Sequence, residues 1–181
     1  GIRERTVYGL TGYWLMSDEY PEIPDYIKNL VESGERIEEI RIDSEGNWYH
    51  EGEPFTNQRI IDFFNRSVDV TADGEYVIHY DDYVYPIVVE DTPVFVTGVR
   101  VEGFSFFEKI YITLTTGEEE ELDETTLYYS RPDGLYCRVQ DGRLPAKFKR
   151  SPSFQLLERL QETDDTYYIS IKGNKVVLEE K

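Results

Sequence analysis

The stretch IEEIRIDSEGNWYHEGEPF, residues 37–55, sets a pattern that a later part of the chain repeats. Ile40 and Ile42 alternate with charged residues, Glu45-Gly46-Asn47 provides turn residues, and Trp48-Tyr49-His50 follows. Alternating apolar residues on either side of a glycine-containing turn are typical of two antiparallel strands. The stretch therefore predicts a β-hairpin.

A helix is expected directly after this hairpin. Thr56 is a suitable N-cap for Asn57–Arg66, in which Ile60, Phe63 and Phe64 contribute to one apolar face. Alternating segments separated by turn residues then predict four strands of a β-meander. These strands are Tyr76–Tyr80, Val84–Glu90, Val94–Val101 and Lys109–Thr115. Upstream of the hairpin, the helical spacing in Pro24–Ser33 predicts one short N-terminal helix.

The last third of the chain repeats this order of elements. Thr126–Ser130 and Leu135–Val139 flank a Pro-Asp-Gly turn and echo the first hairpin. Ser151 as N-cap, with proline as the first helical residue, predicts a helix over Pro152–Glu162. A closing hairpin is predicted from residues 167–178.

This repetition predicts an α+β fold with two related hairpin–helix–sheet motifs, mostly antiparallel strands and an origin by domain duplication. A chance similarity between two α+β stretches is the alternative. The predicted organisation is an N-terminal extension with a short helix at residues 1–36, a first α/β motif at 37–101 and a second at 102–181.

The composition excludes several classes of protein. The 181 residues carry a net charge of −18, yet 39% are hydrophobic and 14% aromatic, which is more core-forming material than a disordered acidic segment has. No apolar run approaches the roughly 18 to 20 residues that span a bilayer. A single cysteine, Cys137, allows no intrachain disulfide, and two histidines are too few for a zinc site with soft ligands. We therefore expect a soluble cytoplasmic protein with no metal and no cofactor.

Tyrosine is unusually frequent, with 15 residues. A core built from this composition has to use tyrosine rings with their hydroxyls at the edge. We expect Tyr49, Tyr76, Tyr136 and Tyr168 to be largely buried and hydrogen-bonded.

Positive charge is concentrated in residues 138–150, which we call the basic island. It contains five basic residues and a single acidic one, Asp141. The basic residues are Arg138, Arg143, Lys147, Lys149 and Arg150. The rest of the chain is strongly acidic and repels a ligand as large as a nucleic-acid duplex, so no nucleic-acid partner is expected.

A small anion that contacts only the basic island is not repelled in this way. Strand alternation places Lys147 and Lys149 on one face and Phe148 with Arg150 on the other. The helix predicted to follow begins with unpaired N–H groups, which also favour an anion. The alternative is a solvated strand whose lysines offset neighbouring carboxylates.

Two further candidates lie in the first half of the chain. Trp48 could stack on a planar ligand or belong to the core. Glu90 and Asp91 could coordinate a cation, accept a hydrogen bond from a sugar hydroxyl, or serve as ordinary turn residues before Thr92-Pro93. The Glu118–Glu121 run is expected to be an exposed loop.

Catalytic residues are scarce. His79 lies near Asp81 and Asp82, but no serine or cysteine motif accompanies them. We therefore predict that the protein is not an enzyme.

Several motifs, in order along the chain, resemble the bacterial family called domain of unknown function 1285. They are EGNWYHEGEPF (residues 45–55), IIDFF (60–64), VEDTPVF (89–95), LYCRV (135–139) and AKFKR (146–150) with Phe154 and Leu156. The resemblance implies two related α/β motifs, a C-terminal part like a pleckstrin-homology barrel, no established activity, and a nucleotide-like ligand between the two halves in signalling. The chain departs from the family pattern at Asn57 and Gln140, where the family tends to have arginine.

Residues and resemblance together predict a non-catalytic small-ligand-binding or signalling module with a site for a small, nucleotide-like anion at the interface of the halves. The candidate ligand-binding residues are Lys147, Lys149, Arg138, Arg143, Arg150, Trp48, Glu90 and Asp91. The alternative is a protein–protein interaction module that uses its acidic surface.

Overall fold

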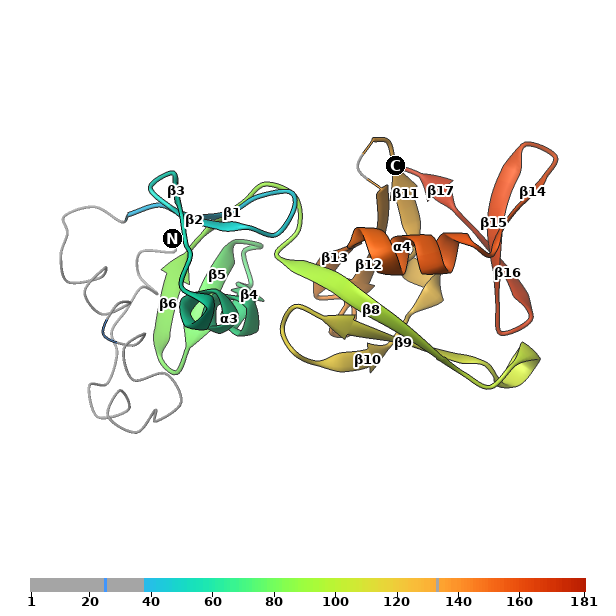
Figure 1. Ribbon diagram of the computed structural model, residues 1–181, viewed down its shortest axis with the longest axis horizontal. Helices are drawn as coiled ribbons and strands as arrows, with labels where there is room; N and C mark the ends of the chain where they lie inside the picture. The colour runs from blue at the N-terminus through green and yellow to red at the C-terminus, as the bar shows by residue number, and fades with distance from the viewer. Residues whose placement is uncertain (1–24, 26–37, 133) are drawn as a thin grey trace. The chain divides into compact units, whose positions relative to one another are not determined.

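The structure is a computed structural model that describes residues 25, 38–132 and 134–181. The chain divides into two compact units, unit 1 up to Pro93 and unit 2 from Val94 to Lys181 (Figure 1). The division therefore precedes strand β8 (Val94–Glu102), whereas the predicted motifs meet at residues 101 and 102. The N-terminal helix predicted over Pro24–Ser33 lies outside the described residues, except for Asp25.

Between residues 38 and 93, unit 1 contains two small sheets and one helix. In the first sheet, β1 (Ile40–Ile42), β2 (Trp48–His50) and β3 (Glu53–Pro54) are antiparallel, and β7 (Val88–Val89) runs parallel to β1. Between β3 and β7 lie the helix and an antiparallel sheet. These elements are α3 (Gln58–Ser67), β4 (Val68–Val70), β5 (Tyr76–Tyr80) and β6 (Tyr83–Pro86). The first predicted hairpin is confirmed, with Ile42 opposite Trp48.

The core of unit 1 gathers aromatic rings between α3 and the first sheet. Trp48 is 2% exposed, and its ring centroid lies 5.2 Å from that of Phe64. The indole Nε1 donates to Asn65 Oδ1 at 2.8 Å, so its polar atom is satisfied. Phe63 of the same helix is 1% exposed. The apolar face predicted for this helix is therefore what packs it onto the sheets.

The N-cap of α3 is Asn57, and the prediction of Thr56 is wrong. The Asn57 side-chain oxygen accepts from the backbone N–H groups of Arg59 at 3.0 Å and Ile60 at 3.4 Å. Asparagine is among the strongest N-cap residues because its side chain satisfies otherwise unpaired donors of the first turn. Asn57, at which the chain departs from the family pattern, thus has a local structural role.

Unit 2 repeats the strand pairings of unit 1. Its elements in chain order are β11 (Tyr128–Ser130), β12 (Gly134–Val139), β13 (Leu144–Phe148), α4 (Arg150–Leu157), β14 (Leu160–Thr163), β15 (Thr166–Ile171), β16 (Asn174–Val177) and β17 (Glu179–Glu180). The order β13-β12-β11-β17, with β17 parallel to β11, matches β3-β2-β1-β7. The sheet β14-β15-β16 likewise matches β4-β5-β6. Each unit therefore runs hairpin, third strand, helix, three-stranded meander and returning strand.

A second meander extends the larger sheet of unit 2. Strand β8 pairs parallel with β13, and β9 (Lys109–Leu114) and β10 (Glu119–Glu121) continue the sheet, which has seven strands. Two short 3-10 helices lie in its connections, η2 (Ser105–Phe107) and η3 (Glu124–Thr126). Among the described residues no pairing joins β10 to β17, so the sheet is open rather than a closed barrel. The fold is a mostly-β α+β architecture with mixed and antiparallel sheets.

Helix α4 differs from its prediction at both ends. It begins at Arg150 with Lys149 as N-cap, so neither Ser151 as N-cap nor Pro152 as first residue is correct. Pro152 is tolerated at the third position because the N–H groups of the first turn have no partner within the helix. The predicted continuation to Glu162 is wrong because Leu160 opens β14, where it pairs with Ile169.

Two strand predictions also need correction. Val84–Glu90 is divided between β6 and β7, because Pro86 ends the pairing with β5 and Val88 turns to pair with β1. Glu118–Glu121 is not a loop, since Glu119–Glu121 form the edge strand β10 on β9. The acidic side chains are typical of a loop, but the backbone of this strand pairs with its neighbour along one side.

The four selected tyrosines are buried to different degrees. Tyr136 is 3% exposed and stacks on Tyr128, with centroids 4.9 Å apart. Tyr49, Tyr76 and Tyr168 are half-buried, and the hydroxyls of Tyr49 and Tyr168 donate to Asp43 and Gln161. Tyr83 and Tyr85 are the other tyrosines in the core, at 5% and 1% exposure.

In the part of the chain that the structure describes, neither helix has the length and apolar character needed to cross a bilayer.

Candidate functional site

The arginines of the basic island bind their own turn. Arg138 Nε donates to the Gly142 carbonyl at 2.8 Å, and its Nη2 donates to the Arg143 carbonyl at 3.3 Å. Arg143 Nη1 donates to Gln140 Oε1 at 3.2 Å. These guanidinium groups therefore brace the connection between β12 and β13. Gln140, the second departure from the family pattern, takes part in this brace.

The two lysines of the island lie above aromatic rings. Lys147 Nζ is 6.0 Å from the centroid of Tyr136, and Lys149 Nζ is 4.7 Å from that of Phe95. Both side chains are half-buried, whereas Phe148 between them is 4% exposed, as strand alternation predicts. Each ammonium is within the distance at which a ring quadrupole attracts a cation. Packing thus accounts for part of the lysine pattern.

Arg150, which directly follows Lys149, is the first residue of α4, and its guanidinium carbon lies 5.4 Å from the centroid of Phe154. It borders a shallow hollow lined by Arg150, Ser151, Phe154, Gln155 and Glu158.

The three candidates of unit 1 have separate roles. Trp48 belongs to the core of that unit. Glu90 is exposed, accepts from the Ser44 backbone N–H at 3.1 Å, and lies 3.6 Å from Arg41 Nη1. Asp91 is half-buried in the turn that follows β7. Glu90 therefore stabilises the connection after β1.

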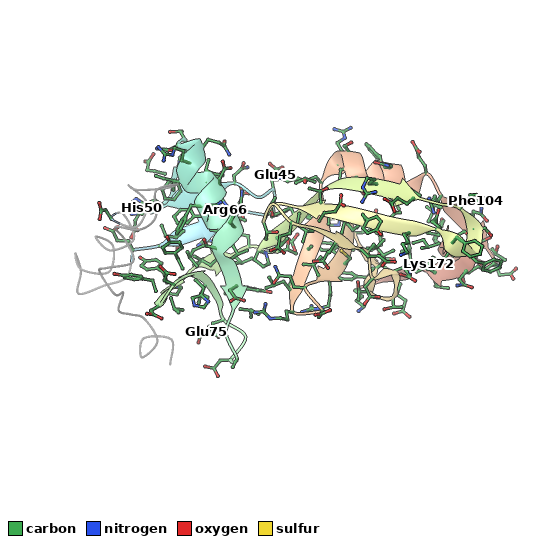
Figure 2. The ribbon with its side chains drawn as sticks, turned by 90° about the horizontal axis from the view of Figure 1, so that it is seen from below. Glu45, His50, Arg66, Glu75, Phe104 and Lys172 are labelled. Carbon is green, nitrogen blue, oxygen red and sulfur yellow. The ribbon has the colours of Figure 1, made fainter. Side chains whose placement is uncertain are left out.

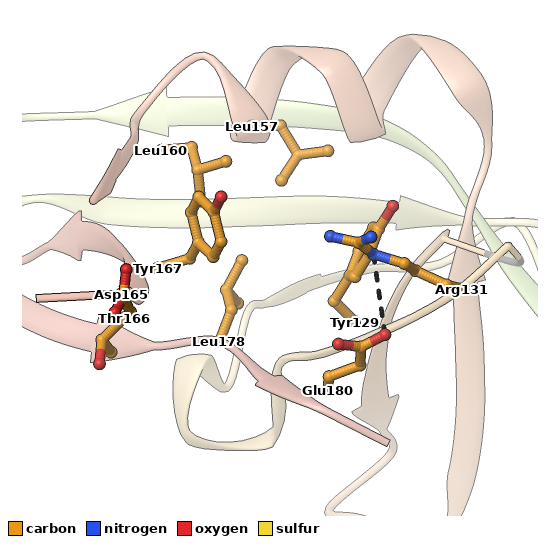
Figure 3. Close-up of a pocket in the computed structure, with 9 residues that line it drawn as sticks. All are labelled: Tyr129, Arg131, Leu157, Leu160, Asp165, Thr166, Tyr167, Leu178 and Glu180. Carbon is orange, nitrogen blue, oxygen red and sulfur yellow. Dashed lines mark ion pairs between the residues drawn. The ribbon is translucent and has the colours of Figure 1, made fainter. Parts of the chain in front are cut away.

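A pocket lies in unit 2, in a region where no sequence pattern predicts one (Figure 3). Its volume is about 550 Å³. The lining residues come from β11, the end of α4, the β14–β15 turn and the last strand. They are Tyr129, Arg131, Leu157, Leu160, Asp165, Thr166, Tyr167, Leu178 and Glu180. None of the eight predicted site residues is among them.

The pocket combines apolar walls with a few charged groups. Figure 3 shows Leu157 and Leu178 between the rings of Tyr167 and Tyr129, and Leu160 beside the ring of Tyr167. Tyr167 is 45% exposed and Leu160 39%, so an incoming molecule can cover apolar surface that water now touches. The pocket therefore offers rings and methyl groups for a planar, partly apolar ligand.

Its charged groups lie at opposite ends. Arg131 Nε is 3.7 Å from Glu180 Oε1, and both side chains are largely exposed, at 70% and 61% (Figure 3). Asp165 lies beside Thr166 on the far side, next to Tyr167. The guanidinium can engage an anionic group, and the Asp165 carboxylate can accept from a donor at the other end of the same ligand.

Two potentially reactive side chains outside this pocket, Cys137 and His79, interact with neighbouring groups. Burial raises the pKa of the Cys137 thiol to about 12, and the carboxylates of Glu120 and Asp123 act in the same direction. His79 Nδ1 lies 3.4 Å from Asp69 Oδ2, a partner on β4. Within residues 38–132 and 134–181, no group of His, Cys, Asp and Glu side chains is placed as metal ligands would be.

No family model and no curated protein matches the chain. Solved structures do match. The structure of a DUF1285 family protein from Silicibacter pomeroyi DSS-3 superimposes with a TM-score of 0.63 at 18% identity, over 78% of this chain and 79% of that one. A DUF1285 family protein from Shewanella baltica OS155 superimposes with a TM-score of 0.52 at 15% identity, over 67% and 92%. The resemblance drawn from the motifs is confirmed: this chain has the fold of DUF1285 family proteins.

Proposed function

We propose that this protein is a non-catalytic module that binds a small, planar, anionic ligand of the nucleotide type in the pocket of unit 2. One observation carries the proposal. Two tyrosine rings, three leucines and an exposed guanidinium line a single pocket of about 550 Å³. Ligand pockets of this kind typically measure about 300 to 1,000 Å³ and pair apolar walls with a few placed polar groups.

Each part of such a ligand has a matching group in the pocket. Stacking of a base on an aromatic ring is worth about 1 to 3 kcal/mol, and Tyr129 and Tyr167 offer such rings. A phosphate can take two parallel hydrogen bonds from Arg131. Its present partner Glu180 is no obstacle, because exposed ion pairs are worth at most about 1 kcal/mol. Asp165 can accept from an exocyclic amino group of the base.

Anion binding by the basic island is a separate prediction within this proposal. Lys147 and Lys149 remain candidates for an anion, and a ligand at the interface of the two halves stays a prediction. The ladder Tyr128–Tyr136–Lys147–Phe95 crosses four paired strands, so a loss of Lys147 would also disturb packing. The experiment below therefore separates the island from the pocket.

The same proposal includes an origin by duplication, a pleckstrin-homology-like part and a cytoplasmic location. The recurring pairings of units 1 and 2 support an origin by duplication, because two unrelated stretches would have to share both sheet orders and the position of the helix. The mostly antiparallel sheets of unit 2, with one helix, suit a pleckstrin-homology-like part. A free, buried Cys137 suits a reducing, cytoplasmic setting for a signalling module.

The test is thermal denaturation of the full chain with a panel of purine and pyrimidine mononucleotides and cyclic nucleotides. A ligand that binds only the folded state raises the melting temperature as its concentration rises. We expect one nucleotide of the panel to stabilise the protein. Arg131→Gln should weaken the binding of that nucleotide at least about tenfold, the effect of one lost charge-assisted contact. Arg143→Gln is the matched control, because Arg143 is exposed and bonds its own turn.

Each result assigns the site. Loss of response in Arg131→Gln but not in Lys147→Gln/Lys149→Gln supports the pocket. Loss only in the lysine variant moves the site to the basic island. A protein that responds to no nucleotide would contradict the proposed function and leave the alternative, a protein-interaction module.

A further inference from the structure

Three phenylalanines stand exposed at the tip of the β8–β9 hairpin, in unit 2. Phe104, Phe106 and Phe107 are 79%, 73% and 83% exposed, more than any other large apolar side chain described. Figure 2 labels Phe104 at this end of the hairpin. Single exposed apolar residues are ordinary, but a cluster of three on one turn marks an interaction site. We call residues 103–108 the aromatic tip.

The aromatic tip has a defined conformation. The Phe107 N–H donates to the Phe104 carbonyl at 3.1 Å, and the Glu108 N–H donates to the Ser105 carbonyl at 3.2 Å, which closes the turn η2. Gly103 has a φ of +71°, and a Cβ there would lie 2.6 Å from the Phe107 carbonyl oxygen. Only glycine fits that position without moving the backbone. The turn that presents the phenyl rings is thus built into the chain.

A sheltered ion pair holds the base of the tip. Arg159 donates to both carboxylate oxygens of Glu108, at 2.7 and 2.8 Å, and Glu108 is 9% exposed. The Lys172 N–H adds a third bond to the same carboxylate at 3.2 Å. Arg159 follows α4 and Lys172 lies in the β15–β16 turn, so three separate segments meet here. The Glu108 carboxyl consequently has a lowered pKa, with Arg159 as the main cause.

This bracing fixes the backbone that presents the rings before any partner arrives. The ring of Phe106 lies against Gly173, where a Cβ would come within 2.9 Å of it. Pre-organised apolar groups lose little freedom on binding, which is how rigid anchors contribute affinity. The tip therefore has the character of a binding anchor.

The surroundings of the tip decide which partner fits. Residues 100–124 contain eight acidic and two basic residues, a net charge of −6, and include the edge strand β10. The C-terminal end of β10 is next to the tip, because Glu121 pairs with Tyr111 of β9 and the Leu122 N–H donates to the Ile110 carbonyl. Apolar rings beside carboxylates complement a surface that is both apolar and basic.

Other occupants fit less well. Three phenyl rings that each bury about 150 to 250 Å² when fully covered supply about 450 to 750 Å², less than the ~800 Å² per partner of a standard interface. Tip-to-tip contact between two copies would therefore be too small, and it would bring together two chains of charge −18. The same charge opposes an anionic lipid surface.

We propose that the aromatic tip, with β10, is a docking surface for a partner protein segment that carries apolar side chains flanked by lysine or arginine. The three rings provide the apolar anchor. Glu118 to Glu121 with Glu124 provide the charge complement, because these five carboxylates outnumber the two cations that pair with them, Arg100 and Lys172. The surface shares no residue with the ligand pocket, so it stands or falls independently of the proposed function.

The test is fluorescence anisotropy of a short labelled amphipathic peptide of leucine and lysine, titrated with the full chain. We expect the wild type to bind the peptide, and Phe104→Ser/Phe107→Ser to lower the affinity at least about tenfold. Glu118→Gln/Glu119→Gln should lower the affinity less, and should make it less dependent on salt concentration. Phe154→Ser is the matched control, because Phe154 is an exposed phenylalanine on α4, 57% exposed. A peptide with serine in place of leucine should bind weakly, and its affinity should be the same for the wild type and for Phe104→Ser/Phe107→Ser.

Several outcomes overturn the proposal. Equal affinity of the wild type and the Phe104→Ser/Phe107→Ser variant for the leucine–lysine peptide would do so, as would no binding by either. Co-sedimentation with phosphatidylcholine vesicles that requires the phenyl rings, without peptide binding, would assign the tip to a membrane surface. Self-association in sedimentation velocity that the same variant abolishes would assign it to a second copy.

Discussion

Replacing Glu108 with glutamine should lower the free energy of unfolding by about 2 kcal/mol. The carboxylate is 9% exposed and accepts two hydrogen bonds from Arg159 and one from the Lys172 N–H. Glutamine keeps one acceptor oxygen but turns an amide N–H₂ toward the second guanidinium nitrogen, so one charge-assisted bond is lost. Such a bond contributes about 1.5 to 3 kcal/mol. Because the Arg159 side chain is 28% exposed, water replaces part of the loss, which places the cost near 2 kcal/mol.

Glu102→Gln is the matched control for this prediction. Glu102 is on the same hairpin and also pairs with an arginine, Arg100, but its side chain is 54% exposed. Exposed pairs are screened by water and hold two mobile side chains at an entropic cost. Glu102→Gln should therefore leave stability almost unchanged. Both variants are compared with the wild type by urea unfolding at neutral pH, followed by far-UV circular dichroism.

The effect of Glu108→Gln should also depend on pH. The Arg159 guanidinium holds the pKa of the Glu108 carboxyl below its ordinary value of 4.5, so the folded state binds this proton less readily than the unfolded state does. The stabilisation is present above that ordinary value and is lost as pH falls through the lowered pKa. The wild type and the variant should converge in acid. Equal unfolding midpoints for Glu108→Gln and Glu102→Gln at neutral pH would refute the reasoning.

Three further predictions concern the core, the first helix and the buried thiol. Trp48→Ala should cost about 3 to 5 kcal/mol in urea unfolding, because it leaves a large cavity beside α3, and a cost below about 1 kcal/mol would show that the ring is not in the core. Asn57→Ala should cost about 1 kcal/mol whereas Thr56→Ala should change stability by less than about 0.5 kcal/mol, and the reverse order would restore Thr56 as the N-cap. Cys137 should resist iodoacetamide in the folded protein and react after unfolding in urea, because burial keeps its thiol protonated, and rapid labelling of the native protein would contradict this.

Much of the fold follows from local patterns in the sequence. The hairpin of β1 and β2, strand β5 and the apolar face of α3 all appear where alternation and helical spacing predict them. The repeated order of elements is also visible, because hairpin turns and helix starts have local signals. Which strands pair with each other has no such local signal. The parallel contacts of β7 with β1 and of β17 with β11 join segments of two residues, too short to show alternation.

The errors at α4 and β10 share one cause. Ser151-Pro152 is a strong local start signal, yet the extended Lys149 that follows strand β13 lets the helix begin at Arg150. The acidic run of β10 resembles a loop, yet its backbone pairs with β9. In both places tertiary pairing overrides a local preference.

The pocket could not have been predicted, because its walls come from five elements, β11, α4, β14, β15 and β17, and its residues are unremarkable one by one. The charge concentration in the basic island was the stronger signal, and in the structure Arg138 and Arg143 bind the connection between β12 and β13. The aromatic tip had a visible signature in GFSFF, residues 103–107, but apolar residues in a sequence are normally read as core. Only exposure in three dimensions distinguishes an anchor from a core segment.

The most direct test of the proposed ligand site is an NMR titration of the isotope-labelled full chain with the nucleotide that stabilises it most. The account predicts that the largest amide shift changes fall on Tyr129, Arg131, Tyr167 and Leu178, around the pocket of unit 2. Changes confined to Lys147 and Lys149, or no changes at a nucleotide concentration that saturates the thermal response, would contradict it.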